Sequence, residues 1–229
     1  MNAIKQLFPR GARRVGRRLY DSLSCRGVAS KVRLGTRDHW HIVVDHLSPA
    51  SIVYSAGVGQ DITFEHALVQ RVGCHIQLFD PSPTGVATMA LAANRHPLIH
   101  FSAIGLADED GLVDFEPPAD PAEGSYLLTT AGVGAATCHF PCKTLRSVMD
   151  GLGHTRIDLL KLDIEGFEYG ILEQIVTDGL HVGQICVEVH PRIVPDGRRR
   201  TEALMASLAR AHYRLIHREM NDLTFLWEQ

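Results

Sequence analysis

Residues 51–59 read Ser51-Ile-Val-Tyr-Ser-Ala-Gly-Val-Gly59, and this stretch decides the fold. Its first half is a mainly apolar run that ends in small residues, which indicates a buried strand. Gly57 and Gly59 follow, and glycine permits a tight turn and lets a ligand approach the backbone. We expect a helix over residues 60–72, whose first amides can bind an anionic group such as a carboxylate. An ordinary loop can also contain two glycines, so the glycine turn indicates a ligand site only together with the motifs that follow it.

The same order of strand and helix repeats along the chain. Further strands are predicted over residues 75–79, 98–103, 156–162 and 184–189, and helices over 83–94, 144–151, 167–178 and 196–211. The remaining segments are a short strand at 39–44, an inserted hairpin or edge-strand region at 104–142, and final strands at 213–218 and 222–227. This alternation predicts an α/β fold with a mostly parallel sheet and helices on both faces. Ligands of such sheets bind beyond the carboxyl ends of the strands.

Asp80 ends the strand that follows the glycine turn, twenty-three residues after Gly57. An acid at this spacing is placed to accept hydrogen bonds from ribose hydroxyls, which indicates a nucleoside cofactor. The third glycine of a dinucleotide-binding turn is missing, because Asp61 and Ile62 occupy that region. Asp61 would repel a pyrophosphate but suits a cationic amino group. The pattern therefore favours S-adenosylmethionine (SAM) over NAD.

Acidic residues also follow two later strands. The first group is Lys161-Leu-Asp163-Ile-Glu165-Gly166, and a period of two places its charged residues on one side if the strand continues. The second group is Glu188-Val-His190-Pro191. A histidine at a strand end beside carboxylates is a candidate general base, because its ordinary pKa lies near neutrality. The plainer interpretations are that Glu165 caps the next helix and that His190 is a hydrogen-bonded structural histidine.

Together these motifs resemble the FkbM family of SAM-dependent methyltransferases, over roughly residues 50–190. The most specific stretch is Ile157-Asp-Leu-Leu-Lys-Leu-Asp-Ile-Glu-Gly-Phe-Glu168, which is similar to the family's signature at its fourth strand. Phe79-Asp80-Pro81 and Thr144-Leu145 also match the family. The resemblance implies a Rossmann-like sheet of about seven strands with the last pair antiparallel. It also implies methyl transfer to oxygen, on a hydroxyl of a small molecule, a sugar or a glycan.

The resemblance further implies where the cofactor binds. SAM would lie across Ser55, Gly57 and Gly59, with its ribose on Asp80 and its methionine end near Asp163. One position departs from the family pattern, because Ser55 stands where an acid is often found. The contact with the cofactor's amino group would then fall to Asp61, Asp163 or water.

For the chemistry, our hypothesis is that His190 removes the proton of the acceptor hydroxyl, oriented by Glu188 or Glu165. Alternatively, Asp163, Glu165 and His190 could hold a magnesium or manganese ion that activates the hydroxyl. Of these two alternatives, we predict the general base, and no metal ion.

Two rival functions remain open at this stage. An NAD-type oxidoreductase would share the architecture, but the third glycine and a Tyr-x-x-x-Lys pair are missing. A catalytically inactive binding or scaffolding domain gains some weight from Ser55. The acids at 80, 163 and 165, together with His190, weigh against it.

Charge divides the chain of 229 residues, which carries a net charge of −3. Residues 1–37 hold ten Lys or Arg and one acid, Asp21, whereas the rest is acidic. We predict a basic amino-terminal arm over residues 1–38, helical at 3–24, and a methyltransferase domain over 39–229. The arm is expected to be a solvated helix; contact with a membrane surface or a polyanionic substrate, or a transit peptide, is the alternative. No nucleic-acid partner is expected, and no oligomeric state is predicted.

The chain has no apolar run long enough to span a membrane. Five scattered cysteines do not form a disulfide pattern, which favours a reducing compartment, and we expect a cytoplasmic protein. Two short motifs invite a zinc interpretation, namely Cys138-x3-Cys142 and His39-x-His41. Because no second ligand pair is evident for the cysteines, we interpret them as strand residues. A period of two places both histidine rings on one face of a strand, where we expect a surface pair rather than a metal site.

Overall fold

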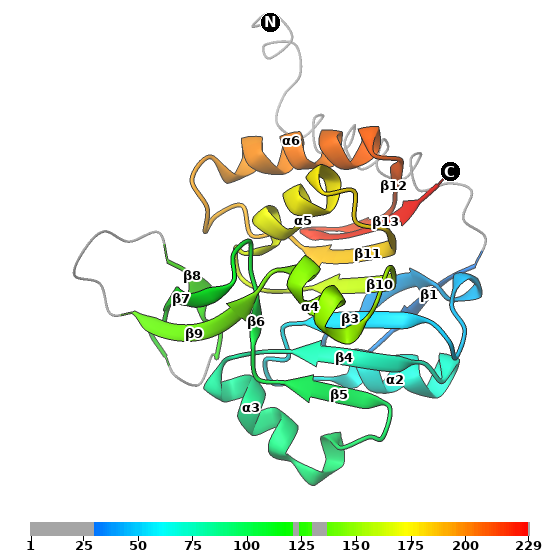
Figure 1. The fold of residues 1–229 in the computed structure, drawn as a ribbon, viewed down its shortest axis with the longest axis horizontal. Coiled ribbons are helices and arrows are strands. Elements are labelled where there is room, and N and C mark those ends of the chain that lie inside the picture. Colours follow the sequence, from blue (N-terminus) through cyan, green and yellow to red (C-terminus); the bar gives the residue numbers. More distant parts are fainter. Residues whose placement is uncertain (1–29, 121–123, 130–136, 229) are drawn as a thin grey trace, which may run out of the picture.

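The computed structural model describes residues 30–120, 124–129 and 137–228. The helix predicted over residues 3–24 lies outside these ranges. The main sheet has seven strands in the order β12-β13-β11-β10-β3-β4-β5 (Figure 1). Their bounds are β3 Ile52–Ala56, β4 His75–Phe79, β5 Ile99–Ser102, β10 Ile157–Leu162, β11 Val182–Glu188, β12 Tyr213–Glu219 and β13 Asp222–Trp227. The first five of these are parallel to one another, whereas β13 is antiparallel to both of its neighbours. The predicted fold class is confirmed.

Strand order places a crevice between β3 and β10. The chain steps outward from β3 to β4 and β5, and later returns to place β10 on the other side of β3. At such a reversal the connections leave in opposite directions, which opens a ligand site beyond the carboxyl ends of the strands.

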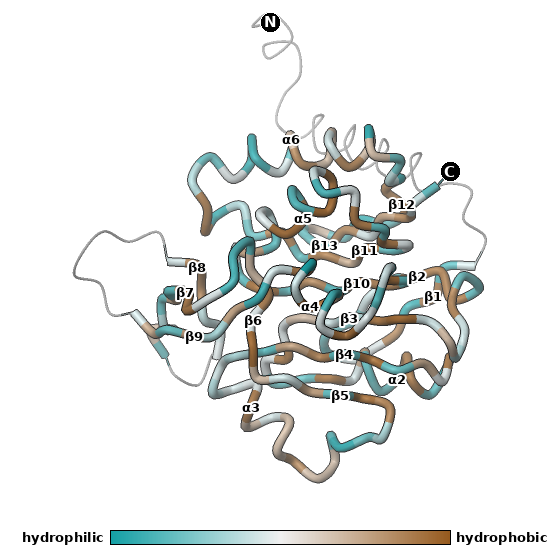
Figure 2. The backbone as a smooth tube through the Cα atoms, in the orientation of Figure 1, coloured by the Kyte–Doolittle hydropathy of each residue, from teal (hydrophilic) through white to brown (hydrophobic). Residues whose placement is uncertain are grey.

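Two layers cover the sheet. The helices are α2 Thr63–Val72, α3 Pro83–Ala90, α4 Leu145–Leu152, α5 Glu168–Thr177 and α6 Gly197–Arg210. Successive strand residues point to opposite faces. Tyr54 therefore packs among the side chains of α4, α5 and α6, whereas Val53 packs against α2 and Trp40. Figure 2 shows hydrophobic residues along the central strands between these layers.

A hairpin of β1 Lys31–Leu34 and β2 Trp40–Val43 completes the face that α2 covers. Its connection to the sheet is specific, because the side-chain amide of Gln184 bonds both the N–H and the carbonyl of Val43, each at 2.9 Å. The domain boundary predicted at residue 38 would separate two paired strands. We therefore assign residues 31–38 to the sheet domain. The alternation of basic and apolar residues in β1 is typical of a strand, but its basic residues led the sequence analysis to group it with the basic arm.

The region at 104–142 forms a second sheet rather than a single hairpin. It contains β6 Gly105–Leu106, β7 Gly111–Glu116, β8 Leu127–Leu128 and β9 Cys138–Lys143, in the order β6-β9-β7-β8. It starts directly after the carboxyl end of β5, and the N–H of Leu128 donates to the carbonyl of Glu165 in the loop after β10. This sheet lies beside the carboxyl ends of the central strands (Figure 1), and residues of β6 and β7 line the cavity there. No helix in the described ranges is long and apolar enough to cross a membrane.

Candidate cofactor and catalytic site

A cavity of about 380 Å³ lies at the carboxyl ends of the central strands. The glycine turn after β3, the acid after β4, the loop after β10 and the end of β11 form its walls, and the inserted sheet adds aromatic side chains. Of the predicted site residues, the cavity is lined by Gly57, Gly59, Asp80, Asp163, Glu165, Glu188 and His190. Residues more than 130 positions apart in the sequence therefore meet at one place.

The glycine turn has no room for a side chain at its first position. A Cβ on Gly57, where φ is +88°, would lie 1.8 Å from the carbonyl oxygen of Asp163. Gly59 also has a positive φ, of +50°, but a Cβ there would meet nothing within 4 Å. Gly57 is thus required by the close approach of the loop after β10, whereas Gly59 is required only by its backbone conformation.

Asp80 holds this turn in place. Its Oδ2 accepts hydrogen bonds from the N–H groups of Val58 and Gly59, at 2.9 and 3.1 Å, and its Oδ1 accepts one from the N–H of Ser82 at 2.8 Å. An ionised carboxylate offers about four acceptor positions. One position is therefore left for a ligand hydroxyl on the cavity side.

Ser55 and Asp61 do not line the cavity, so their expected cofactor contacts need correction. Ser55 lies on the face of β3 that packs against α2, where its buried hydroxyl donates to Glu65 at 2.5 Å. Asp61 accepts hydrogen bonds from the backbone and hydroxyl of Thr63 and from the N–H of Asp38. It fixes the start of α2 to the β1–β2 turn, and we assign neither residue to the cofactor.

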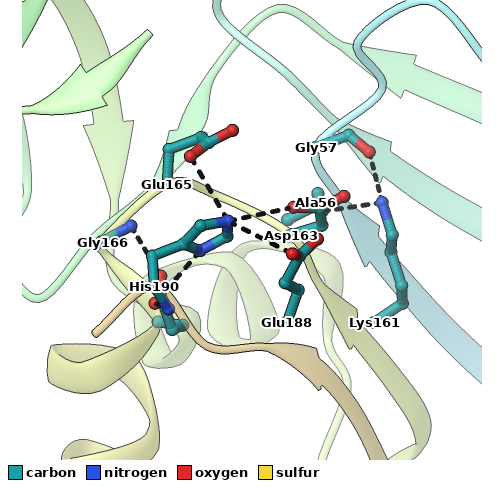
Figure 3. A network of polar contacts seen from close by, with 9 residues as sticks. Ala56, Gly57, Lys161, Asp163, Glu165, Gly166, Glu188 and His190 are labelled. Carbon is teal, nitrogen blue, oxygen red and sulfur yellow. Dashed lines mark hydrogen bonds and ion pairs between the residues drawn. The ribbon is translucent and has the colours of Figure 1, made fainter. Parts of the chain in front are cut away.

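A buried charged pair under the turn was missed by the sequence analysis. The ammonium group of Lys161 donates to the carbonyls of Ala56 and Gly57 (Figure 3). Burial raises the pKa of the Glu65 carboxyl, and the charge of Lys161 partly offsets that effect. Lys161 is 4% exposed and Glu65 is 3% exposed. These two residues support the glycine turn from the protein interior rather than the ligand side.

His190 stands at the centre of a ring of carboxylates (Figure 3). Its Nε2 lies 3.3 Å from Glu165 and 3.9 Å from both Asp163 and Glu188. Its Nδ1 lies 3.3 Å from Oε1 of Glu168. One side of the imidazole is thus anchored in the protein, and the other faces the cavity.

Glu168 is the anchor, in place of the predicted Glu188 or Glu165. It is fully buried, and it accepts hydrogen bonds from the N–H groups of His190 and Gly166, each at 2.7 Å. The predicted alignment of Lys161 with Glu165 does not hold either, because β10 ends at Leu162 and Glu165 has a positive φ of 50°. Glu168 belongs to the quoted signature, but its place at a helix start gave no sign that it would turn inward.

The acids dominate the electrostatics of the cavity. Burial alone would lower the pKa of His190, but its hydrogen bond with Glu168 and the charges of Glu168 and Glu165 outweigh it and raise the pKa to about 9. Burial and the neighbouring Asp163 raise the pKa of Glu188 to about 7. His190 is therefore a cation at neutral pH, and this wall of the cavity still suits a second positive charge.

The same residues also meet the geometric requirement for a metal ion. One ligand atom from each of Asp163, Glu165 and His190 lies within 4.8 Å of the other two.

The β1–β2 turn also contributes Arg37 and Asp38 to the lining of the cavity. Arg37 is the one arginine in the lining, and its charge suits a ligand carboxylate.

A sheet of this order, with a glycine turn, an acid after the next strand and a cavity beside them, defines a Rossmann-like α/β protein. The comparisons with known proteins add the family. The sequence profile named Methyltransferase FkbM domain matches residues 48–215. The chain therefore belongs to the FkbM methyltransferase family, which confirms the resemblance.

Curated relatives are similar over part of their length. Probable methyltransferase-like protein 24 of Homo sapiens is 26% identical over 140 residues, which cover 60% of this chain and 32% of the relative. The protein of the same name from Rattus norvegicus is 26% identical over 175 residues, covering 72% and 42%. The chain thus spans less than half the length of the curated relatives it matches.

Two solved structures resemble the fold more distantly. A Methanococcus jannaschii fibrillarin pre-rRNA processing protein has a TM-score of 0.46 and 9% identity, with 89% of this chain and 85% of that chain covered. A methyltransferase from Pyrococcus furiosus has a TM-score of 0.37 and 8% identity, with 94% and 98% covered. The fold assignment rests on the strand order described above.

Proposed function

We propose that the protein transfers a methyl group from SAM to a hydroxyl of a small molecule, sugar or glycan. The observation that carries this proposal is the cavity itself, in which the turn-bound Asp80 faces an acidic wall around His190. When bound, SAM supplies an electrophilic methyl group on a positively charged sulfur. A dinucleotide would bring a pyrophosphate to a wall that is already rich in carboxylates.

The chain offers a partner for each polar part of SAM. Asp80 keeps one acceptor position for a ribose hydroxyl, in addition to the three bonds that fix the turn. Asp163 lines the cavity beside Gly57 and suits the cofactor's ammonium group. Arg37, from the turn between β1 and β2, lines the same cavity and suits the carboxylate. These residues bind and orient, which supplies much of the rate of a displacement at carbon.

His190 is the residue we propose to accept the proton of the acceptor hydroxyl, at Nε2. Its Nδ1–H stays on Glu168, which fixes the orientation of the ring. Because the pKa of His190 is about 9, its ring is protonated at neutral pH before SAM binds. In this form His190 cannot accept the proton of the acceptor hydroxyl. The pKa of His190 falls when a second positive charge lies beside it, because like charges disfavour protonation. Proton removal thus becomes linked to cofactor binding.

The test is methyl transfer from labelled SAM to components of a cell extract, followed by identification of the labelled product. We expect an O-methylated product, and we expect His190→Gln to lower turnover by roughly 10²–10⁴-fold without weakening SAM binding, because the variant lacks the cation that opposes the cofactor's positive charge. His46→Gln, at an exposed histidine that does not line the cavity, is the matched control and should keep full turnover.

Three results would contradict parts of this proposal. SAM binding without any methylated product would indicate an inactive binding domain, and a label on nitrogen or carbon would exclude O-methylation. Activity that is lost on chelation and restored by magnesium would assign Asp163, Glu165 and His190 to a metal instead of a base.

A further inference from the structure

A second group of side chains that could bind a metal ion lies outside the cofactor cavity, where the β1–β2 hairpin meets the carboxyl-terminal strands. His39 and His41 come from the hairpin, and His217 and Glu219 come from β12. None of the four lines the cavity. The sequence predicted only a surface pair at His39 and His41, because the other two residues are more than 170 positions away.

The distances bring His41, His217 and Glu219 around one point, and His39 contacts the carboxylate of Glu219. The Nε2 atoms of His39 and His217 lie 3.5 and 3.9 Å from the same oxygen of Glu219. Ligand atoms of His41, His217 and Glu219 all lie within 4.8 Å of one another. Around a tetrahedral zinc with bonds of about 2.0–2.2 Å, neighbouring ligand atoms are roughly 3.3–3.5 Å apart. The distances from Glu219 to His39 and to His217 are already close to that spacing.

The backbone that carries the ligands is held by other bonds. The hydroxyl of Thr224 donates to the carbonyl of His41 at 2.8 Å, and Lys31 Nζ donates to the carbonyl of Ile216 at 2.6 Å. These two bonds join the hairpin to β13 and β12 without using any of the four candidate side chains. The fold therefore brings the backbone segments that carry the ligands together, and a metal would have to reorient only side chains.

His217 gives the site an independent sign of a missing partner. Its Nε2 is buried and has no hydrogen-bond partner among the described residues, and the carboxylate 3.9 Å away is too distant for one. A buried polar atom without a partner costs about 1–3 kcal/mol and calls for an explanation. The pairing of β12 with β13 also shifts register between Leu215 and His217. Such a bulge re-aims the side chain that follows it.

We propose that His41, His217 and Glu219 bind a zinc ion that joins the β1–β2 hairpin to β12, and that His39, which contacts Glu219, completes the site as the fourth ligand. Three imidazoles and one carboxylate suit zinc, whereas magnesium and calcium prefer oxygen ligands alone. The rings of His41 and His217 are stacked, with centroids 3.7 Å apart and planes at 26°. Because a metal lies in the plane of each ring it binds, His41 turns out of this stack when zinc enters.

The position of the hairpin links the zinc site to the cofactor cavity. The turn between β1 and β2 carries Arg37 and Asp38 into the cavity lining. Zinc that fixes β2 against β12 therefore also fixes this part of the cavity wall. The proposal does not depend on the reaction, because binding and stability can be measured without an acceptor.

The experiment is a calorimetric titration of zinc into full-length protein freed of metal by a chelator. We expect one zinc per chain at this site, a rise in melting temperature, and a tetrahedral absorption spectrum when cobalt replaces zinc. Glu219→Gln should weaken binding by more than ~100-fold and abolish the thermal shift, since loss of even an outer partner of a ligand typically costs 10–100-fold. Glu219 is an exposed side chain, so this variant should remain folded.

Two controls separate this site from other metal-binding groups. His100→Gln disrupts the stacked pair of His75 and His100, whose centroids are 5.2 Å apart, and should leave zinc binding unchanged. Glu165→Gln removes a ligand atom of the group in the cofactor cavity and should also leave it unchanged. The proposal is overturned if the wild-type protein takes up no zinc, or if Glu165→Gln abolishes uptake while Glu219→Gln does not.

Discussion

At the scale of single residues, the chemistry depends on a carboxylate that never meets the ligand. Glu168 is buried under the site and bonds both the backbone and the ring of His190. Its negative charge stabilises the imidazolium, and a raised histidine pKa means that the basic form appears only at higher pH. The neutral-range pKa that the sequence predicts for His190 therefore needs correction in the free protein.

Glu168→Gln should move the pH dependence of turnover to lower pH. Turnover rises with pH as His190 loses its proton, and removing the charge of Glu168 lowers the pKa at which this happens. The glutamine oxygen can still accept from the ring and the N–H of His190, and the amide nitrogen loses only the bond from the N–H of Gly166. The measurement is the pH profile of kcat, supported by NMR titration of the ring. Glu173→Gln on the exposed side of α5 is the control, and an unshifted profile in Glu168→Gln would contradict this role.

At the scale of elements, β3, β10 and α2 are joined beneath the glycine turn. Lys161 of β10 lies beside Ser55 of β3, and Glu65 of α2 bonds that serine. A strict period of two along the sequence predicts instead that Lys161 lies on the same side as the acids at 163 and 165. Only the pairing of the two strands shows that Lys161 points toward α2 and bonds the turn from within.

Lys161→Met should destabilise the protein by about 1–3 kcal/mol, because it removes the buried donor to the carbonyl of Gly57 and the positive charge that partly offsets the burial of Glu65. The loss should grow as pH rises above 4.5, the ordinary value for a glutamate. The folded variant holds the proton of Glu65 more tightly than the unfolded chain does, so deprotonation favours unfolding. Urea denaturation at several pH values tests this. The double variant with Glu65→Gln should recover much of the stability, and equal losses in both would argue against a coupled pair.

At the scale of the whole molecule, the sequence predicted the sheet well and the additions to it less well. The strand at 75–79 matches β4 at both ends, because a short apolar run between turn residues leaves little choice. The inserted sheet was not resolved into strands, since β6 pairs in parallel with β9, more than thirty residues further along. The inward turn of Glu168 and the burial of Ser55 likewise depend on long-range packing that no local pattern records.

The β1–β2 hairpin leads to a prediction about two shortened forms of the protein. Removal of residues 1–30 should leave SAM binding intact, because the cavity-lining residues begin at Arg37. Removal of residues 1–38 should abolish binding, since it deletes β1, Arg37 and the backbone that bonds Asp61. Circular dichroism and calorimetry on the two truncated proteins distinguish these outcomes. A folded 31–229 fragment that fails to bind SAM would show that the first thirty residues take part in the site.

The central claim is that the cavity holds SAM with Asp80 at its ribose, and calorimetry of SAM binding tests it most directly. We predict one SAM per chain, no binding of NAD, and a loss of about 1–3 kcal/mol in Asp80→Ala, which removes a charge-assisted hydrogen bond to the ligand and loosens the turn. Asp45→Asn, at an exposed acid outside the cavity, should bind as the wild type does. Tight binding of NAD without binding of SAM, or unchanged SAM affinity in Asp80→Ala, would contradict the account.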